Sequence, residues 1–95
     1  MCTNVFNLAS VKEKEAFEDT LKRIGQKLTK LRQKMGYTSH ESFAYDYEIP
    51  RVQYWRIEKG KTNLTMKSLS RLLDIHKITI EEFFIALHKE SRTGN

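Results

Sequence analysis

Residues 38–63, TSHESFAYDYEIPRVQYWRIEKGKTN, determine the fold that this sequence predicts. At the start of the stretch, Thr38 and Ser39 are both candidate N-caps, because a hydroxyl oxygen can accept a hydrogen bond from the free N–H groups of a first helical turn. Thr38 has Glu41 three residues later, whereas Ser39 leads directly into the helical residues. Either cap predicts a short helix that runs to about Tyr47.

A tight turn and a second helix follow in the same stretch. Pro50 has its φ angle fixed near the helical value and biases Ile49 toward an extended backbone, so the turn is expected just before the proline. The second helix is expected over 50–59 and stops at Gly60. Two short helices joined by a tight turn indicate a helix-turn-helix, a unit whose second helix enters the major groove of DNA.

The second helix of this unit has two different faces. At 3.6 residues per turn, Tyr54, Ile57 and Glu58 share one side and are expected to face inward. The remaining positions form a polar, partly aromatic outer surface: Arg51, Val52, Trp55 and Arg56. An arginine fork can donate two hydrogen bonds at once to guanine O6 and N7, and a valine can contact a thymine methyl group. On spacing alone, the alternative is that Arg51 and Arg56 belong to an ordinary solvated helix face without a binding role.

The residues before this unit predict a long amphipathic helix. Its apolar residues recur in steps of three and four: Phe17, Leu21, Ile24, Leu28, Leu31 and Met35. Ser10 and Glu13 form a capping-box pattern at the start, and Gly36 is expected to end the helix. Gly25 in the interior costs about 1 kcal/mol relative to alanine, so a break near Ile24 is an alternative.

Two more helices are expected after residue 65. Thr79 and Glu82 form a second capping-box pattern. Residues at helical spacing define the two apolar faces: Met66, Leu69, Leu72 and Leu73 for one helix, and Ile80, Phe83, Phe84 and Leu87 for the other. Because no window alternates with a period of two, the predicted fold class is all-α, a bundle of five helices.

The composition restricts the classes of function. The chain has 95 residues, of which 39% are hydrophobic, and this predicts one small folded domain. Cys2 is the one cysteine and allows no internal disulfide, and His40, His76 and His88 lack the spacing of zinc ligands. No cofactor or metal is therefore expected. An enzyme is not expected either, because the sequence has no Gly-rich phosphate loop and no nucleophile beside a base.

The longest apolar runs are too short for a membrane span, and residues 1–10 do not resemble a secretory signal. A cytoplasmic protein without a membrane partner is therefore expected.

The positive charge of the chain is unevenly distributed. The formal net charge is +5, from 17 basic and 12 acidic residues. Residues 36–49 contain three carboxylates and no lysine or arginine, whereas residues 50–63 contain four basic residues and one acidic residue. A positive surface attracts phosphate polymers, acidic proteins and anionic lipids alike. The charge by itself does not choose among these partners.

The quoted stretch and its flanks resemble the lambda-repressor-like helix-turn-helix family, also called the Xre or Cro type. The resemblance covers residues 24–84. It is carried by Ile24-Gly25 with Leu28, Leu31 and Arg32, by Ser39-His40-Glu41-Ser42-Phe43-Ala44, and by Ile57-Glu58-Lys59-Gly60-Lys61. The last two motifs, in this order and at this separation, are specific together. The resemblance implies a lambda-repressor-like five-helix bundle that binds double-stranded DNA as a transcription regulator, most commonly a repressor.

Carried over residue by residue, the resemblance implies three groups of site residues. Arg51, Val52 and Arg56 would meet base edges, with Gln53 and Trp55 beside them. Phosphate contacts would come from His40, Lys59, Lys61 and Asn63. Arg32 and Glu58 match an ion pair that bridges the first and third helices, which implies a structural role for Glu58.

Several positions depart from the family pattern. Glu48 stands in the turn where a small residue, often glycine, is common, and Pro50 stands where a hydroxyl cap is common. The connection from Gly36 to Ser39 is one residue longer than usual. His76 replaces a typically apolar residue, and we expect it to be a partly buried packing residue instead of a ligand.

Three segments are expected: an N-terminal, partly helical extension (1–23), the helix-turn-helix domain (24–84), and the end of the last helix with a flexible tail (85–95). Phe17 and Leu21 continue the apolar stripe of the first helix into the extension. The extension is therefore expected either to assemble a homodimer, which suits a two-fold operator, or to fold back on its own core.

A second class of function uses the same fold. In this alternative the protein is an interaction module or antitoxin that binds a protein partner such as a toxin. A module that binds only protein has no need of Arg51, Arg56 and Lys61 together, so these residues favour DNA.

Overall fold

The computed structural model describes residues 10–93, which form five helices and no strand. Their order is α2 (Ser10–Lys34), α3 (His40–Asp46), α4 (Arg51–Glu58), α5 (Met66–His76) and α6 (Ile80–Thr93). The all-α prediction is therefore confirmed over this range. Cys2, which bears on the expected absence of a disulfide, lies outside the described residues, as does the side chain of Ser10, which bears on the first capping box.

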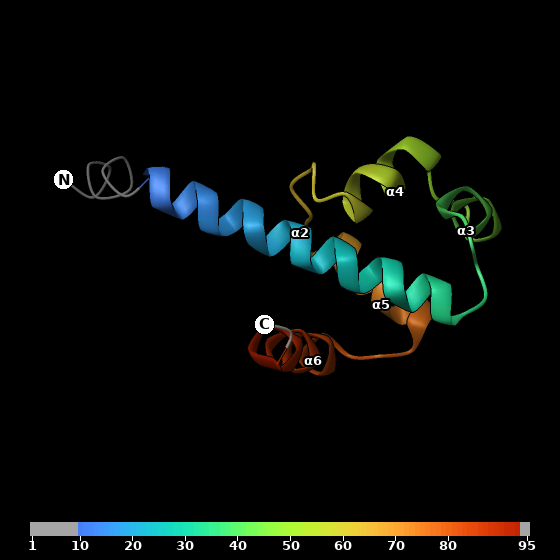
Figure 1. Cartoon of the computed structure of the whole chain (residues 1–95). Helices are drawn as coiled ribbons and strands as arrows, with labels where there is room; N and C mark the ends of the chain where they lie inside the picture. Colours follow the sequence, from blue (N-terminus) through green and yellow to red (C-terminus); the bar gives the residue numbers. More distant parts are fainter. Residues whose placement is uncertain (1–9, 94–95) are drawn as a thin grey trace.

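α2 is the longest helix, and the other four gather around its C-terminal half (Figure 1). α3 and α4 lie on one side of α2 and α6 lies on the other, while the first turns of α2 project beyond all of them. Arg23 Nη2 donates a hydrogen bond to the Leu87 carbonyl oxygen at 3.3 Å. Lys27 forms an ion pair with Glu90, so two polar contacts tie α2 to α6.

Side-chain caps determine where α3 and α6 begin. Of the two candidates at α3, Ser39 is the cap, and its Oγ accepts a hydrogen bond from the Ser42 N–H at 3.1 Å. At α6 the predicted capping box is confirmed. The Glu82 N–H donates to Thr79 Oγ1 at 3.0 Å, and the Thr79 N–H donates to Glu82 Oε1 at 2.9 Å. These bonds satisfy N–H groups that have no partner within the helix.

α2, α3, α4 and α5 all end in the same way. Just past each end, one N–H donates to the carbonyl five residues earlier, and the residue before that N–H has a positive φ. Gly36 and Gly60 occupy two of these positions, but Glu48 (φ 56°) and Lys77 (φ 60°) occupy the other two. A residue other than glycine costs about 1 kcal/mol in this left-handed conformation. The turn before α4 therefore has the usual backbone shape, and Glu48 adopts a strained backbone conformation within it.

The core lies where the C-terminal half of α2 meets the other helices. Its largest fully buried side chains are Leu28, Phe43, Tyr54, Leu73 and Phe83. Phe43 of α3 lies at the centre of an aromatic group that contains Tyr37, Tyr47, Tyr54 and His76. Aromatic ring pairs at these separations add to the stabilisation from burial alone, so Phe43 helps to hold α3 against its neighbours.

Two members of the predicted apolar stripe of α2 are not in the core. Phe17 is 49% exposed and Met35 is 40% exposed. Phe17 lies in the N-terminal half of α2, and Met35 lies beyond Lys34, the last helical residue. Helical spacing identified the face correctly but not the length over which neighbouring helices cover it.

The break near Ile24 does not occur, because α2 is continuous through Gly25. A Cβ atom at Gly25 would lie 2.2 Å from the carbonyl oxygen of Glu58, far closer than van der Waals contact. The absence of a side chain therefore lets the backbone of α2 touch the end of α4. This glycine weakens the helix locally and is required by the packing.

We expect Gly25→Ala to destabilise the protein by about 1–3 kcal/mol, the usual cost of inserting a methyl group into a close contact. Helix propensity alone gives the opposite sign, a gain of about 1 kcal/mol. Urea denaturation followed by circular dichroism measures the free energy of unfolding. Gln26→Ala, at an exposed position of the same helix, is the control, and a Gly25→Ala protein more stable than the wild type would contradict the proposed contact.

Candidate nucleic-acid interface

α3, the turn and α4 form a helix-turn-helix in which one face of α4 points away from the core (Figure 1). Tyr54, Ile57 and Glu58 are buried, as their spacing predicts. On the other side Arg51, Val52, Gln53 and Arg56 are exposed, and Trp55 is half-buried. Val52 is 57% exposed, so this surface offers an apolar group together with two guanidinium groups.

Two of the residues expected to read bases lie at the edge of this surface. Gln53 lines a cavity of about 60 Å³ between α4 and α5, together with Arg71 and Leu72. Trp55 is partly covered. Arg51, Val52 and Arg56 are therefore the candidates for base contacts in the middle of this surface, and Gln53, which is also exposed, lies at its edge toward α5.

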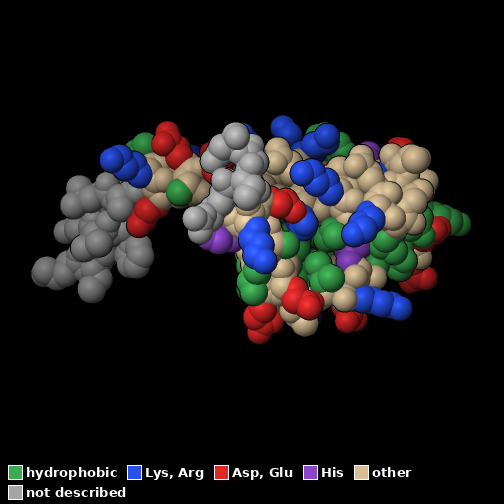
Figure 2. Space-filling model, turned by 60° about the horizontal axis from the view of Figure 1, so that its bottom comes forward, with side chains coloured by type: hydrophobic (Ala, Val, Ile, Leu, Met, Phe, Trp, Pro, Cys, Tyr) green, Lys and Arg blue, Asp and Glu red, His purple; other side chains and the backbone are tan. Residues whose placement is uncertain are grey.

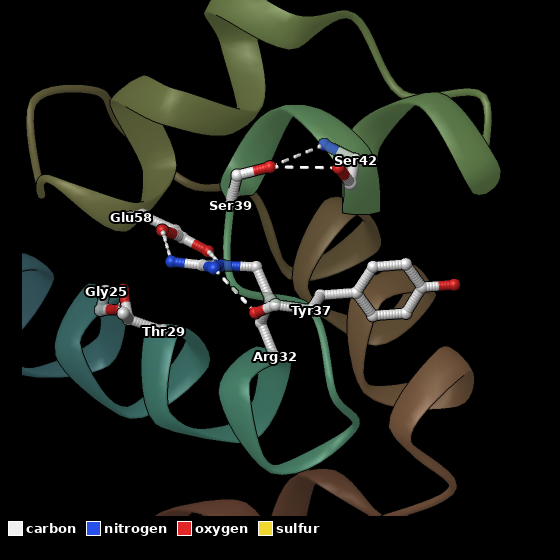
Figure 3. Close-up of polar contacts among 7 residues, drawn as sticks. All are labelled: Gly25, Thr29, Arg32, Tyr37, Ser39, Ser42 and Glu58. Carbon is white, nitrogen blue, oxygen red and sulfur yellow. Dashed lines mark hydrogen bonds and ion pairs between the residues drawn. The ribbon is translucent and has the colours of Figure 1, made fainter.

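A buried ion pair fixes the orientation of α4. Arg32 Nε donates to Glu58 Oε2 at 2.7 Å, and Arg32 Nη2 donates to Glu58 Oε1 at 3.2 Å, so the contact is bidentate (Figure 3). Arg32 Nη1 donates to the Tyr37 carbonyl oxygen at 2.9 Å. The two residues are 5% and 6% exposed. These are the residues that the family resemblance pairs, and the pair joins α2 to α4.

The charges in this buried pair support one another. Burial alone would lower the pKa of Arg32, but the hydrogen bond and the charge of Glu58 outweigh it, and the pKa lies above its ordinary value. Tyr54 lies nearby and is fully buried. Burial and the Glu58 carboxylate raise the pKa of Tyr54, so its phenol is neutral beside the ion pair.

His76 of α5 packs against α3. Its ring lies parallel to that of Phe43, with 5.5 Å between the centroids and 5° between the planes. Burial lowers the pKa of His76, because the charged imidazolium loses its hydration. The half-buried, stacked ring matches the packing role expected for this residue.

Arg51 is not isolated on the outer surface of α4. Its Nη1 lies 3.4 Å from Oε2 of Glu41, in the first turn of α3, and both side chains are more than half exposed. An exposed pair of this length contributes little to stability. Sequence reasoning took Glu41 as a capping residue and missed this contact, which depends on the angle between α3 and α4.

The residues expected to contact phosphate fall into two places. Lys59, Lys61 and Asn63 are exposed and surround Gly60 just beyond α4. His40 is half-buried in the first turn of α3, next to the Ser39 cap. The structure therefore groups three of the four at the C-terminal end of α4 and leaves His40 with α3.

A further lysine lies beside this first group, and sequence reasoning did not assign it. A Cβ atom at Gly60 would lie 2.7 Å from the Cα of Lys22 in α2. Lys22 lies in the segment expected to be an extension, outside the motifs of the resemblance. Nothing in the sequence indicates that it meets the loop after α4.

Comparison with known proteins gives one informative match. No family model and no solved structure matches the chain. Control protein C.MunI of a Mycoplasma species is 38% identical over 68 residues, which span 72% of this chain and 92% of that protein. The chain belongs to the control-protein family. The matched region covers nearly the whole relative, whereas this chain has further residues outside that region.

None of the helices within residues 10–93 combines the length and the apolar character that a membrane span requires.

We expect Glu58→Gln to destabilise the protein by about 3–5 kcal/mol, because it leaves the Arg32 guanidinium buried without a carboxylate. Glu41→Gln is the matched control: the same substitution breaks an exposed pair and should cost at most about 1 kcal/mol. Urea denaturation measures both. Equal effects of the two substitutions would show that burial of the pair does not determine its importance.

The lowered pKa of His76 predicts a pH dependence of stability. Below the ordinary histidine pKa of 6.5, the unfolded chain binds a proton that the folded protein binds less readily. Stability is therefore retained above pH 6.5 and falls as the pH decreases below it. We expect His76→Phe to reduce this loss of stability at low pH. Urea denaturation at several pH values between about 5.5 and 7.5 measures it. His88→Gln, at an exposed histidine, is the control, and an unchanged pH profile in His76→Phe would contradict the assignment.

Proposed function

We propose that this protein is a helix-turn-helix transcription regulator of the Xre type that binds duplex DNA sequence-specifically, with α4 in the major groove. Its membership of the control-protein family supports a DNA-binding regulator. The observation that carries the proposal is the outer surface of α4, where Arg51, Val52 and Arg56 are exposed while the opposite face is fixed by a buried ion pair.

The side chains on this surface have the chemistry that base recognition requires. Each arginine can donate two parallel hydrogen bonds to guanine O6 and N7, and Val52 can contact the methyl group of thymine. A rigid helix keeps these groups at fixed separations, because Tyr54 and Ile57 on its other face are buried in the core. The proposed readout therefore uses Arg51, Val52 and Arg56, with Gln53 and Trp55 beside them.

Phosphate contacts would set the position of the helix in the groove. Lys59, Lys61 and Asn63 follow the end of α4, and His40 lies in the first turn of α3. Such contacts orient a protein on the duplex without reading its sequence. Two separate groups of contacts on the helix-turn-helix would hold α4 at a defined angle.

Repression is the mode of action that we propose, through occupancy of an operator. One domain of this size buries little DNA surface, and a two-fold operator is best matched by a symmetric homodimer. The exposed arginines of α4 support DNA as the main partner in preference to a protein such as a toxin.

The two kinds of basic residue should fail differently. We expect Arg51→Ala or Arg56→Ala to cost about 1–3 kcal/mol on the cognate duplex and much less on random DNA, so discrimination falls. Lys61→Ala should weaken both duplexes by similar factors and reduce the slope of log affinity against log salt by about 0.9.

The test begins with selection of bound duplexes from a random pool, followed by fluorescence anisotropy on the selected duplex and on a scrambled one. Thermal melting of each variant controls for folding, because none of the three side chains is buried. If all three variants bind DNA as the wild type does and instead lose a protein partner, the interaction-module function replaces this proposal.

A further inference from the structure

α2 is in close backbone contact with the C-terminal end of α4 and the loop after it at two places, and in each place one of the contacting residues is a glycine. Gly25 of α2 faces the Glu58 carbonyl oxygen, and Gly60 after α4 faces the backbone of Lys22. In both places a Cβ atom would lie less than 3 Å from backbone atoms of the other element. The position of Lys22 relative to the loop after α4 is therefore fixed by backbone contact.

Two hollows open on either side of Lys22. One, of about 470 Å³, lies between α2 and the end of α4 and is lined by Gln26, Thr29, Lys30 and Lys59 as well as Lys22. The other, of about 410 Å³, lies between α2 and the loop and includes Lys61 and Asn63. Amide, hydroxyl and ammonium groups, all hydrogen-bond donors, thus predominate around Lys22.

The charge around these hollows is positive. Lys22, Lys30, Lys59 and Lys61 are all exposed, and within the described part of the chain none of them forms an ion pair. Of the two carboxylates that line the hollows, Glu58 is already paired with Arg32, which leaves Glu18. By contrast, basic and acidic side chains are interspersed on the face of the molecule that contains α6, which is turned toward the viewer in Figure 2.

We propose that Lys22 and Lys30 form a phosphate-binding row on α2 that continues the contacts of Lys59 and Lys61 along the DNA backbone. This inference rests on the proposed function, which places α4 in the major groove. The end of α4 then lies where the sugar–phosphate backbone borders the groove, and α2 is the element in contact with that end. The ligand is the phosphodiester backbone of the same duplex.

A purely structural role would explain the same lysines in another way. The C-terminus of a helix carries a partial negative charge, and cations near it are stabilising. If Lys22 and Lys30 served only to balance the partial negative charge at the end of α4, their removal would lower thermal stability. The affinity of the folded protein for DNA would then stay unchanged. Salt dependence separates the two roles, because only neutralised phosphates release counterions.

The test compares two double variants of equal charge. Lys22→Gln/Lys30→Gln removes the proposed row, and Lys12→Gln/Lys14→Gln removes two exposed lysines from the projecting start of α2, at least about 12 Å further along the helix. Affinity for the selected duplex and for a scrambled one is measured by fluorescence anisotropy at several salt concentrations. Thermal melting accompanies each variant.

We expect the first variant to bind both duplexes more weakly by the same factor, and the salt slope to fall by about 1.8, or 0.9 for each phosphate contact. The second variant should keep the wild-type slope. An unchanged slope in the first variant, or an equal fall in both, would overturn the phosphate-binding row. If the wild type binds neither duplex, the proposed function fails first, so the two failures are distinguishable.

Discussion

The bidentate contact between Arg32 and Glu58 is the constraint on which the rest of the structure depends. Two charges removed from water are stabilising only when their geometry is good and their remaining hydrogen-bonding groups have partners. Here the Tyr37 carbonyl oxygen accepts the third guanidinium bond. The angular position of α4 on α2, and with it the direction of its outer face, follows from this requirement. A lysine in place of Arg32 has no planar fork and cannot meet it.

Close backbone contact complements the ion pair. At Gly25, α2 and the end of α4 meet without an intervening side chain, so the stabilising contacts come from the ion pair at Arg32 and from direct backbone packing about two turns earlier in α2. The same junction brings α2 next to the basic loop after α4. Stability and the proposed DNA contacts therefore share one region, where a substitution affects both unless it is confined to an exposed side chain such as Lys61.

Much of the fold could be predicted from local sequence because local chemistry determines it. The capping pair Thr79 and Glu82, the helix before Gly36 and the inward face of α4 depend on residues within a few positions of one another. The packing role of Gly25 inside this helix could not be predicted, because the backbone contact that requires a glycine there is with a residue more than thirty positions away. The exposure of Phe17 depends likewise on where the other helices end.

The candidate site divides in the same way. Arg51 and Arg56 are identifiable from helical spacing, whereas the partner of Arg51 is set by the angle at which α3 meets α4. The pairing of Arg32 with Glu58 came from resemblance, since spacing along the chain contains no information about it. Lys22 had no sequence signal at all, and only the approach of α2 to Gly60 places it beside the loop.

α2 is a single uninterrupted helix from its projecting first turns to the ion pair that holds α4. The outer turns of α2 and the orientation of α4 are therefore linked in angular phase. One residue inserted ahead of Leu21 would leave the domain intact but rotate everything N-terminal to it by about 100° and displace it by about 1.5 Å. Any group that the outer turns of α2 contact is thus held in a fixed rotational relation to α4. An insertion or deletion in this segment preserves that relation only when it adds or removes whole helical turns.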